Sequence, residues 1–84
     1  MNNLLNLAIQ DTKAGRKQAA YKKLHTVMQQ NPSNEEAEIA WLCLAQLLTD
    51  PAKQRTCFEK VIRLNPNNKI ALNGLKRLTN YSVT

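Results

Sequence analysis

Few residues in this chain have the types and spacing that an enzyme's chemistry requires. The single histidine, His25, falls on the polar side of a helical pattern, and general acid–base catalysis by it would need a positioned partner. Asp11, Asp50 and the glutamates are accounted for by helix caps, helix dipoles and surface pairs. The sequence holds no glycine-rich phosphate-binding loop and no metal-ligand cluster. We therefore predict that the protein is not an enzyme and has no catalytic residue, metal site or cofactor.

Cys43 and Cys57 are the remaining residues with reactive side chains. Their spacing is neither that of a metal-binding pair nor that of a CxxC redox motif. Both lie within apolar patterns, and free cysteine is among the most buried residue types. We favour two reduced core thiols, with a disulfide between them as the lesser alternative.

The length of 84 residues predicts one domain, which we place at residues 1–80 with a short tail at 81–84. The longest apolar run, from Ile39 to Ala45, has seven residues, whereas a membrane-spanning helix needs about 20. The first residues lack the basic region and cleavage site of a secretory signal. We therefore expect a cytoplasmic protein that does not enter the membrane.

Two Asn-Pro dipeptides divide the sequence at a regular interval. Asn31-Pro32 and Asn65-Pro66 each close a helical pattern, because the residue before a proline is disfavoured in the helical region. The prolines stand 34 residues apart, and a period of about 34 residues is typical of helix-turn-helix repeats of the tetratricopeptide type. The spacing predicts a helical repeat.

Further turn signals complete a prediction of five helices. Gly15 suits the left-handed conformation just after a helix. Ser33 begins a capping box with Glu36 three residues later, and Asp50-Pro51 supplies a cap followed by a proline in the first helical position. The predicted helices span about residues 3–14, 16–30, 34–48, 51–64 and 68–80.

Apolar residues at helical spacing predict the core. The third helix is apolar almost all round, so we expect it to be central and covered on several sides, with Trp41 as its largest buried side chain. Gly74 inside the fifth helix indicates close packing against another helix. The predicted core residues are Ala20, Leu24, Val27, Trp41, Leu44, Ala45, Leu48, Phe58, Val61, Ala71 and Leu75.

Over nearly its full length, the chain resembles a tetratricopeptide-repeat protein. The framework positions of the first repeat match Leu4, Leu7, Ala8, Gly15, Ala20, Leu24, Val27 and Pro32, and those of the second match Trp41, Leu44, Ala45, Leu48, Phe58, Val61 and Pro66. The short turn at Asp50-Pro51 is similar to that of one bacterial subgroup. The resemblance implies an all-α fold: a short α-solenoid of antiparallel helix pairs, with two repeats and a C-terminal capping helix.

The resemblance also implies a scaffold that binds a protein or peptide instead of catalysing a reaction. Its concave wall would come from the first helix of each repeat and from the capping helix. Carrying over the family's positions gives Asn2, Leu5, Ile9, Thr12, Lys13, Ile39, Leu42, Gln46, Thr49, Ile70, Asn73 and Arg77. Such a wall would suit an amphipathic helix or an extended apolar segment with acidic residues. The identity of the partner stays open.

The net charge of +6 supports an alternative. Basic residues gather at Lys13, Arg16, Lys17, Lys22 and Lys23, from the end of the first predicted helix into the second, and at Lys69, Lys76 and Arg77 in the fifth. The alternative is an adaptor that binds nucleic acid or an acidic partner through these two faces. We favour a solvated basic surface over a nucleic-acid site, because no arginine run or interleaved aromatic residues accompany the charge.

Assembly is a separate question, because helical repeats usually need about three units for stability. The first helix carries Leu4, Leu5, Leu7 and Ile9, which one neighbouring helix cannot cover completely. A marginal monomer, a fragment of a longer array and a homodimer all stay open. The homodimer is the sharpest of these hypotheses.

Overall fold

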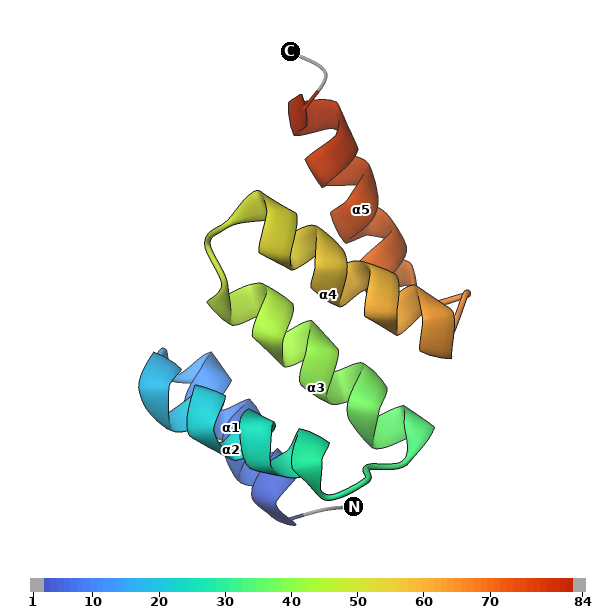
Figure 1. Cartoon of the computed structure of the whole chain (residues 1–84). Coiled ribbons are helices and arrows are strands. Elements are labelled where there is room, and N and C mark those ends of the chain that lie inside the picture. The colour runs from blue at the N-terminus through green and yellow to red at the C-terminus, as the bar shows by residue number, and fades with distance from the viewer. Residues whose placement is uncertain (1–2, 83–84) are drawn as a thin grey trace.

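Five α-helices joined by short turns make up the computed structural model, which describes residues 3–82 (Figure 1). They are α1 (Asn3–Lys13), α2 (Lys17–Gln29), α3 (Asn34–Leu47), α4 (Pro51–Leu64) and α5 (Lys69–Ser82). The predicted all-α class is confirmed, and the described residues contain no strand. The helix bounds agree with prediction to within a residue or two. The last helix reaches Ser82, so the predicted tail begins too early.

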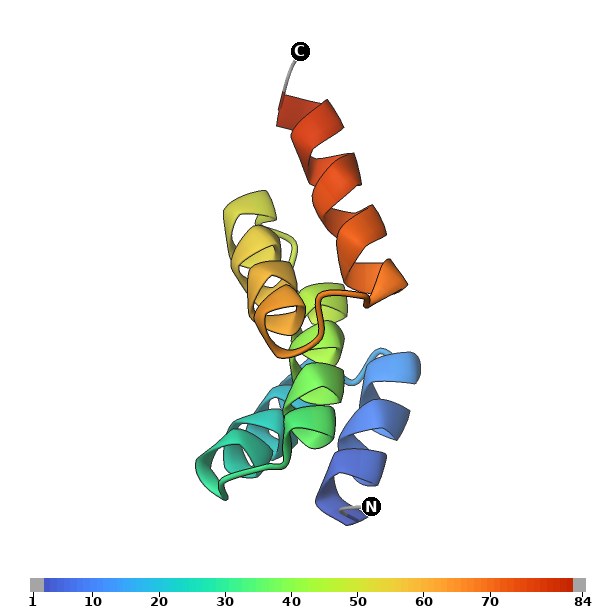
Figure 2. The ribbon, with the colours of Figure 1, turned by 90° about the vertical axis from the view of Figure 1, so that its right-hand side faces the viewer.

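The helices stack in consecutive antiparallel pairs, with α3 at the centre. α3 packs against α1, α2 and α4, while α5 packs against α4. In Figure 2, α2 and α4 lie on one side of α3, and α1 and α5 lie on the other. The molecule is elongated, with principal extents of 40 × 25 × 17 Å. This arrangement gives the molecule two distinct faces, one on each side of α3.

The predicted turn chemistry is confirmed. Gly15 has a φ of +77°, which glycine adopts without steric cost. The Ser33 hydroxyl accepts a hydrogen bond from the Glu36 backbone N–H at 3.1 Å, and the Glu36 carboxylate accepts one from the Ser33 N–H at 2.9 Å. The Asp50 carboxylate caps α4 by accepting from the Ala52 N–H at 2.9 Å. These local bonds set where α3 and α4 begin.

The two Asn-Pro pairs differ in their backbones, so the two helical segments that end in them are not equivalent. Asn31 is left-handed with a φ of 52°, whereas Asn65 is extended with a φ of −147°. The side-chain amides of Asn65 and Asn68 both donate to the Glu38 carboxylate, the former at 2.9 Å. The Asn68 side-chain oxygen also caps α5 by accepting from the Ala71 N–H at 2.9 Å. The second pair therefore ties the start of α3 to the loop before α5.

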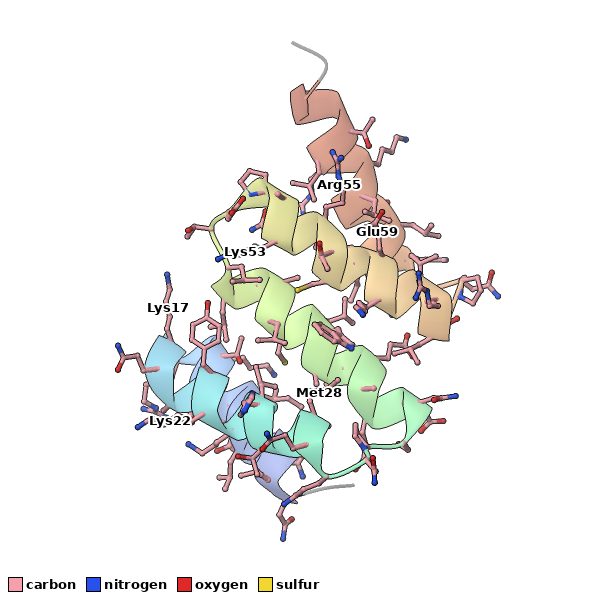
Figure 3. All side chains as sticks on the ribbon, viewed as in Figure 1. Lys17, Lys22, Met28, Lys53, Arg55 and Glu59 are labelled. Carbon is pink, nitrogen blue, oxygen red and sulfur yellow. The ribbon has the colours of Figure 1, made fainter. Side chains whose placement is uncertain are left out.

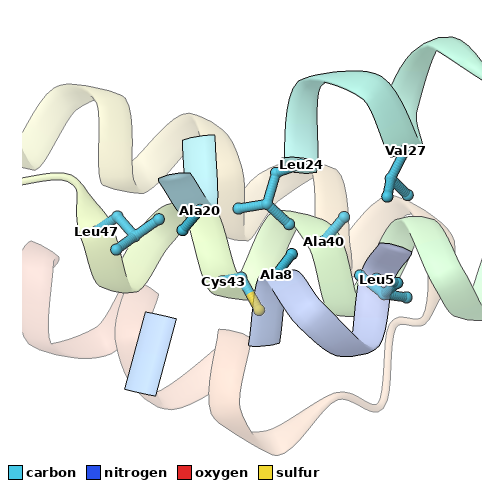
Figure 4. Packing of buried hydrophobic residues seen from close by; sticks show 8 residues of the cluster. All are labelled: Leu5, Ala8, Ala20, Leu24, Val27, Ala40, Cys43 and Leu47. Carbon is cyan, nitrogen blue, oxygen red and sulfur yellow. The ribbon is translucent and has the colours of Figure 1, made fainter. Parts of the chain in front are cut away.

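A first core cluster joins α1, α2 and α3 (Figure 4). Its buried members are Leu5, Ala8, Ala20, Leu24, Val27, Ala40, Cys43 and Leu47. Leu7 is 48% exposed, as expected for a first helix whose apolar residues one neighbouring helix cannot cover completely. At about 100° per residue, Leu7 lies nearly opposite Leu5 on the helix, and Leu5 faces the core.

A second cluster joins α3, α4 and α5. It is built on Ala45, Cys57, Phe58, Val61 and Ala71, with Trp41, Leu44, Leu48 and Leu75 among the half-buried residues packed against it. Leu44 also packs against the first cluster, so α3 connects the two. Trp41 is only half-buried, and its ring lies 5.6 Å from the Lys60 ammonium. α3 is therefore central but not enclosed, which corrects the prediction for Trp41.

Gly74 and Phe58 form a close contact between α5 and α4. A Cβ atom added at Gly74 would lie 2.5 Å from two atoms of the Phe58 ring, which is far inside van der Waals contact. Both residues are buried. The mid-helix glycine thus lets the two helices approach, as its position in the sequence predicted.

Gln54 closes the C-terminal end of α3. Its side-chain amide donates to the Leu48 carbonyl at 2.6 Å and to the Ala45 carbonyl at 3.5 Å. Carbonyls at the end of a helix have no partner within the helix and need one from elsewhere. In the short turn at Asp50-Pro51, a long amide side chain can provide it.

Candidate protein-binding site

A groove about 540 Å³ in volume opens where α3, α4 and α5 meet. We call it the α3–α5 groove. Its lining residues are Leu42, Ala45, Gln46, Thr49, Pro51, Gln54, Phe58, Ile70, Gly74, Arg77 and Leu78. α5 leans away from α3 in Figure 2, on the side where α1 also lies. The groove therefore belongs to the face formed by α1, α3 and α5.

The chemistry of the α3–α5 groove is apolar, with a polar margin. Leu42 and Phe58 contribute apolar surface, and Ile70 on α5 is 59% exposed. Gln46 and Arg77 are exposed and provide an amide and a guanidinium. Arg77 is the only charged residue in the lining. Such a surface can bury apolar side chains and hydrogen-bond a carbonyl or carboxylate beside them.

Five of the predicted concave-face residues meet in this groove. Leu42, Gln46 and Thr49 come from α3 and the turn after it, and Ile70 and Arg77 come from α5. Asn73 lies next to them, because it lines a neighbouring hollow together with Ile70 and Arg77. The fold thus gathers residues from α3 and from α5, which are far apart in sequence.

The predicted residues of α1 do not line the groove. Leu5 is fully buried in the first cluster, so its assignment to a binding surface is wrong. Its helical position turns it toward α2 and α3 instead of toward solvent. Ile9 is half-buried against the same cluster, and Thr12 uses its hydroxyl to donate to the Ala8 carbonyl at 2.8 Å. Lys13 is exposed at the end of α1.

Ile39 and Asn2 are the remaining predicted positions of the concave wall. Ile39 on α3 is half-buried and packs against the first cluster, away from the α3–α5 groove. Asn2 lies outside the described residues. The predicted concave-wall residues that share one groove therefore all come from α3, the turn after it and α5.

Several lining residues escaped the sequence prediction. Phe58 and Leu78 were treated only as interior or unassigned positions, although both line the groove. Gln54, whose amide donates to the Leu48 carbonyl, also lines the groove. The useful signal was Gly74, since a mid-helix glycine marks a close approach and its partner Phe58 lies at the groove floor.

A second groove, about 510 Å³ in volume, lies on the other face. We call it the α2–α3 groove. Its lining residues are Tyr21, Lys22, His25, Met28, Trp41 and Leu44. Figure 3 is viewed from this side, and Lys22 and Met28 are labelled on α2. The sequence pattern predicted Trp41 and Leu44 as core residues, and of this lining only Lys22 belongs to the basic face of the alternative prediction.

The basic faces of α2 and α5 do not form one surface. α2 lies at one end of the molecule and α5 at the other, with α3 and α4 between them (Figure 1). A nucleic-acid site that used both faces would have to span the whole length of the molecule. The alternative based on these two faces therefore gains no support from the arrangement.

The two cysteines have unreactive surroundings. Both are buried free thiols, as we favoured, and they belong to different core clusters. Burial raises the pKa of the Cys43 thiol, and burial also raises the pKa of the Cys57 thiol. The nucleophilic thiolate form is therefore disfavoured at neutral pH.

Between residues 3 and 82, no three His, Cys, Asp or Glu side chains are grouped so that they could hold a metal ion. Over the same residues, no helix has the length and apolar character needed to cross a membrane.

Comparisons of the chain with protein-family models, with curated proteins and with solved structures found no match. The proposals below therefore rest on the residues and their geometry.

Proposed function

We propose that this protein is a non-catalytic scaffold of the tetratricopeptide type, which binds a protein or peptide through the face formed by α1, α3 and α5. The observation that carries the proposal is the α3–α5 groove, where residues predicted for the concave wall converge on an apolar floor. Grooves of this kind bind helical or extended segments by taking up their apolar side chains.

The composition of the groove indicates what the bound segment would offer. Apolar side chains would cover Leu42, Phe58 and the exposed part of Ile70. An acidic or carbonyl group would pair with Arg77, and the Gln46 amide would accept or donate one hydrogen bond. Anchors that fill an apolar pocket usually dominate the energy of such contacts.

Affinity capture from an extract of the source cells tests this proposal. The chain offers a matched pair of variants on α5, since Ile70 and Leu72 are 59% and 46% exposed but only Ile70 lines the groove. We expect Ile70→Asp to lose the captured proteins and Leu72→Asp to keep them. Equal capture by both variants and the unmodified protein would refute the proposal.

Self-association is a second candidate, and the exposure of Leu7 favours it. Leu7 is 48% exposed on α1, at the end of the molecule opposite α5, and an interface between copies would cover it. Light scattering at micromolar concentration should then give twice the chain mass of 9.5 kDa, and Leu7→Asp should restore the single-chain mass. A single-chain mass for the unmodified protein at all concentrations would exclude the homodimer.

A further inference from the structure

The α2–α3 groove has the composition of a docking site but no role in the function proposed above. Tyr21 and Met28 from α2 face Trp41 and Leu44 from α3 across it, and all four are half-buried. Aromatic residues and methionine are enriched where proteins bind other proteins. The groove lies on the face of α2 and α4, which is opposite the α3–α5 groove (Figure 2).

The charged residue in the lining of this groove is basic, and the glutamates of α3, which are Glu35, Glu36 and Glu38, do not line it. Lys22 lines it, Lys60 reaches over the Trp41 ring from α4, and Lys53 lies on the same face of the molecule (Figure 3). α2 contains no acidic residue. The one acidic residue of α4, Glu59, lies on the edge of α4 toward α5, away from the groove. An apolar groove with a basic margin is complementary to an apolar segment with acidic margins.

We propose that the α2–α3 groove binds an acidic amphipathic helix of another protein. The groove follows α2 from Tyr21 to Met28, which is about 10 Å, or two helical turns, at about 1.5 Å per residue. Apolar side chains spaced three and four apart on a partner helix cover the same length. Acidic residues flanking this stripe would meet Lys22 and Lys60.

The same observations disfavour two other occupants. A second copy of this chain is unsuitable, because the net charge is +6 and the groove margin is also basic. Single-stranded nucleic acid requires open aromatic faces for its bases. Here the Lys60 ammonium lies over the Trp41 ring, and the lining is mainly apolar.

Trp41 makes the proposal testable by fluorescence, since it is the only tryptophan in the chain. The probe is a synthetic peptide of about 18 residues, a length at which an isolated helix is marginally stable. It carries leucines at helical spacing and glutamates elsewhere, with no tryptophan or tyrosine. We expect a saturable blue shift of Trp41 emission, and no shift with a peptide of the same composition in scrambled order.

Charge reversal shows whether the groove itself is responsible. The double variant Lys22→Glu, Lys60→Glu should bind the peptide at least about tenfold more weakly, while Lys69→Glu, Lys76→Glu on α5 changes the net charge equally and should bind normally. Circular dichroism would check that both variants are folded. Ile70→Asp should bind the peptide normally, because the α3–α5 groove is a separate site.

Three results would overturn the proposal: no saturable shift, equal weakening by both double variants, or a shift of the same size with the scrambled peptide. A fourth would be tighter binding of single-stranded RNA than of the peptide, with the same Trp41 response. None of these results bears on capture through the α3–α5 groove, so the two proposals can fail separately.

Discussion

Asp11 links α1 to α2 through an ionic contact. Its carboxylate accepts from the Lys23 ammonium and from Arg16 Nε, the latter at 3.0 Å. The residue is 7% exposed, between α1 and α2. The start of α2 is thereby fixed to α1.

This contact predicts a pH dependence of stability. The hydrogen bond from Lys23, and then that from Arg16, lowers the pKa of Asp11 below its ordinary value of 3.8. The resulting stabilisation is present at pH values above about 3.8 and is lost as the pH falls through the lower pKa of the folded state. We expect Asp11→Asn to reduce stability at pH 7 and to flatten the decline of the melting temperature in acid.

The control for that measurement is Glu59→Gln, a change of the same type at an exposed site. Its melting temperature should follow that of the unmodified protein across the same pH range. If Asp11→Asn declines in acid as steeply as the unmodified protein, the contribution assigned to Asp11 is wrong.

Gly74 is the second residue whose role can be measured alone. Alanine there would favour the helix by about 1 kcal/mol, but its Cβ would meet the buried Phe58 ring, and overpacking costs about 1–3 kcal/mol. We expect Gly74→Ala to lower the free energy of unfolding by about 1 kcal/mol in chemical denaturation. Lys76→Ala, at an exposed site on α5, should change it by less than about 0.5 kcal/mol. A stabilising Gly74→Ala would contradict the close contact.

At the scale of helices, the link from Glu38 to Asn65 and Asn68 sets the position of α5. We expect Glu38→Ala to cost about 1–2 kcal/mol, because two amides lose a charged acceptor. Hydrogen exchange should show the loss of protection mainly in α5. Glu35→Ala removes a carboxylate from the same helical turn but is exposed, so it isolates the effect of the two asparagines. Equal changes for both variants would argue against the link.

Helix limits were predictable from the sequence because caps and breakers act locally. Gly15, Ser33 and Asp50 each make contacts with residues only a few positions away. Local patterns did not reveal which apolar side of a helix faces the core. α1 has apolar residues on more than one side, so choosing between Leu5 and Leu7 required its neighbours.

The candidate site was predictable only in part, for the same reason. Gln46 and Arg77 belong to helices that meet only after folding, and the family resemblance placed them on one wall. Trp41 was assigned to the core because it is large and apolar. Its partial exposure depends on the space between α2 and α4, which no single segment of sequence encodes.

At the scale of the whole molecule, the stack of helices offers two separate grooves. The α3–α5 groove is nearly neutral with one arginine, whereas the α2–α3 groove has a basic margin. No residue lines both grooves. A small scaffold of this kind would be able to hold two partners at once, one on each side of α3.

Site-specific photo-crosslinking in the source cells would show whether a partner occupies the α3–α5 groove. A benzophenone amino acid would replace Gln46, which is exposed in the groove, and in a parallel strain Glu59, which is exposed outside it. We predict a discrete crosslinked species of higher mass from position 46 only, which Ile70→Asp abolishes. No crosslink from position 46, or the same species from position 59, would contradict binding through this groove.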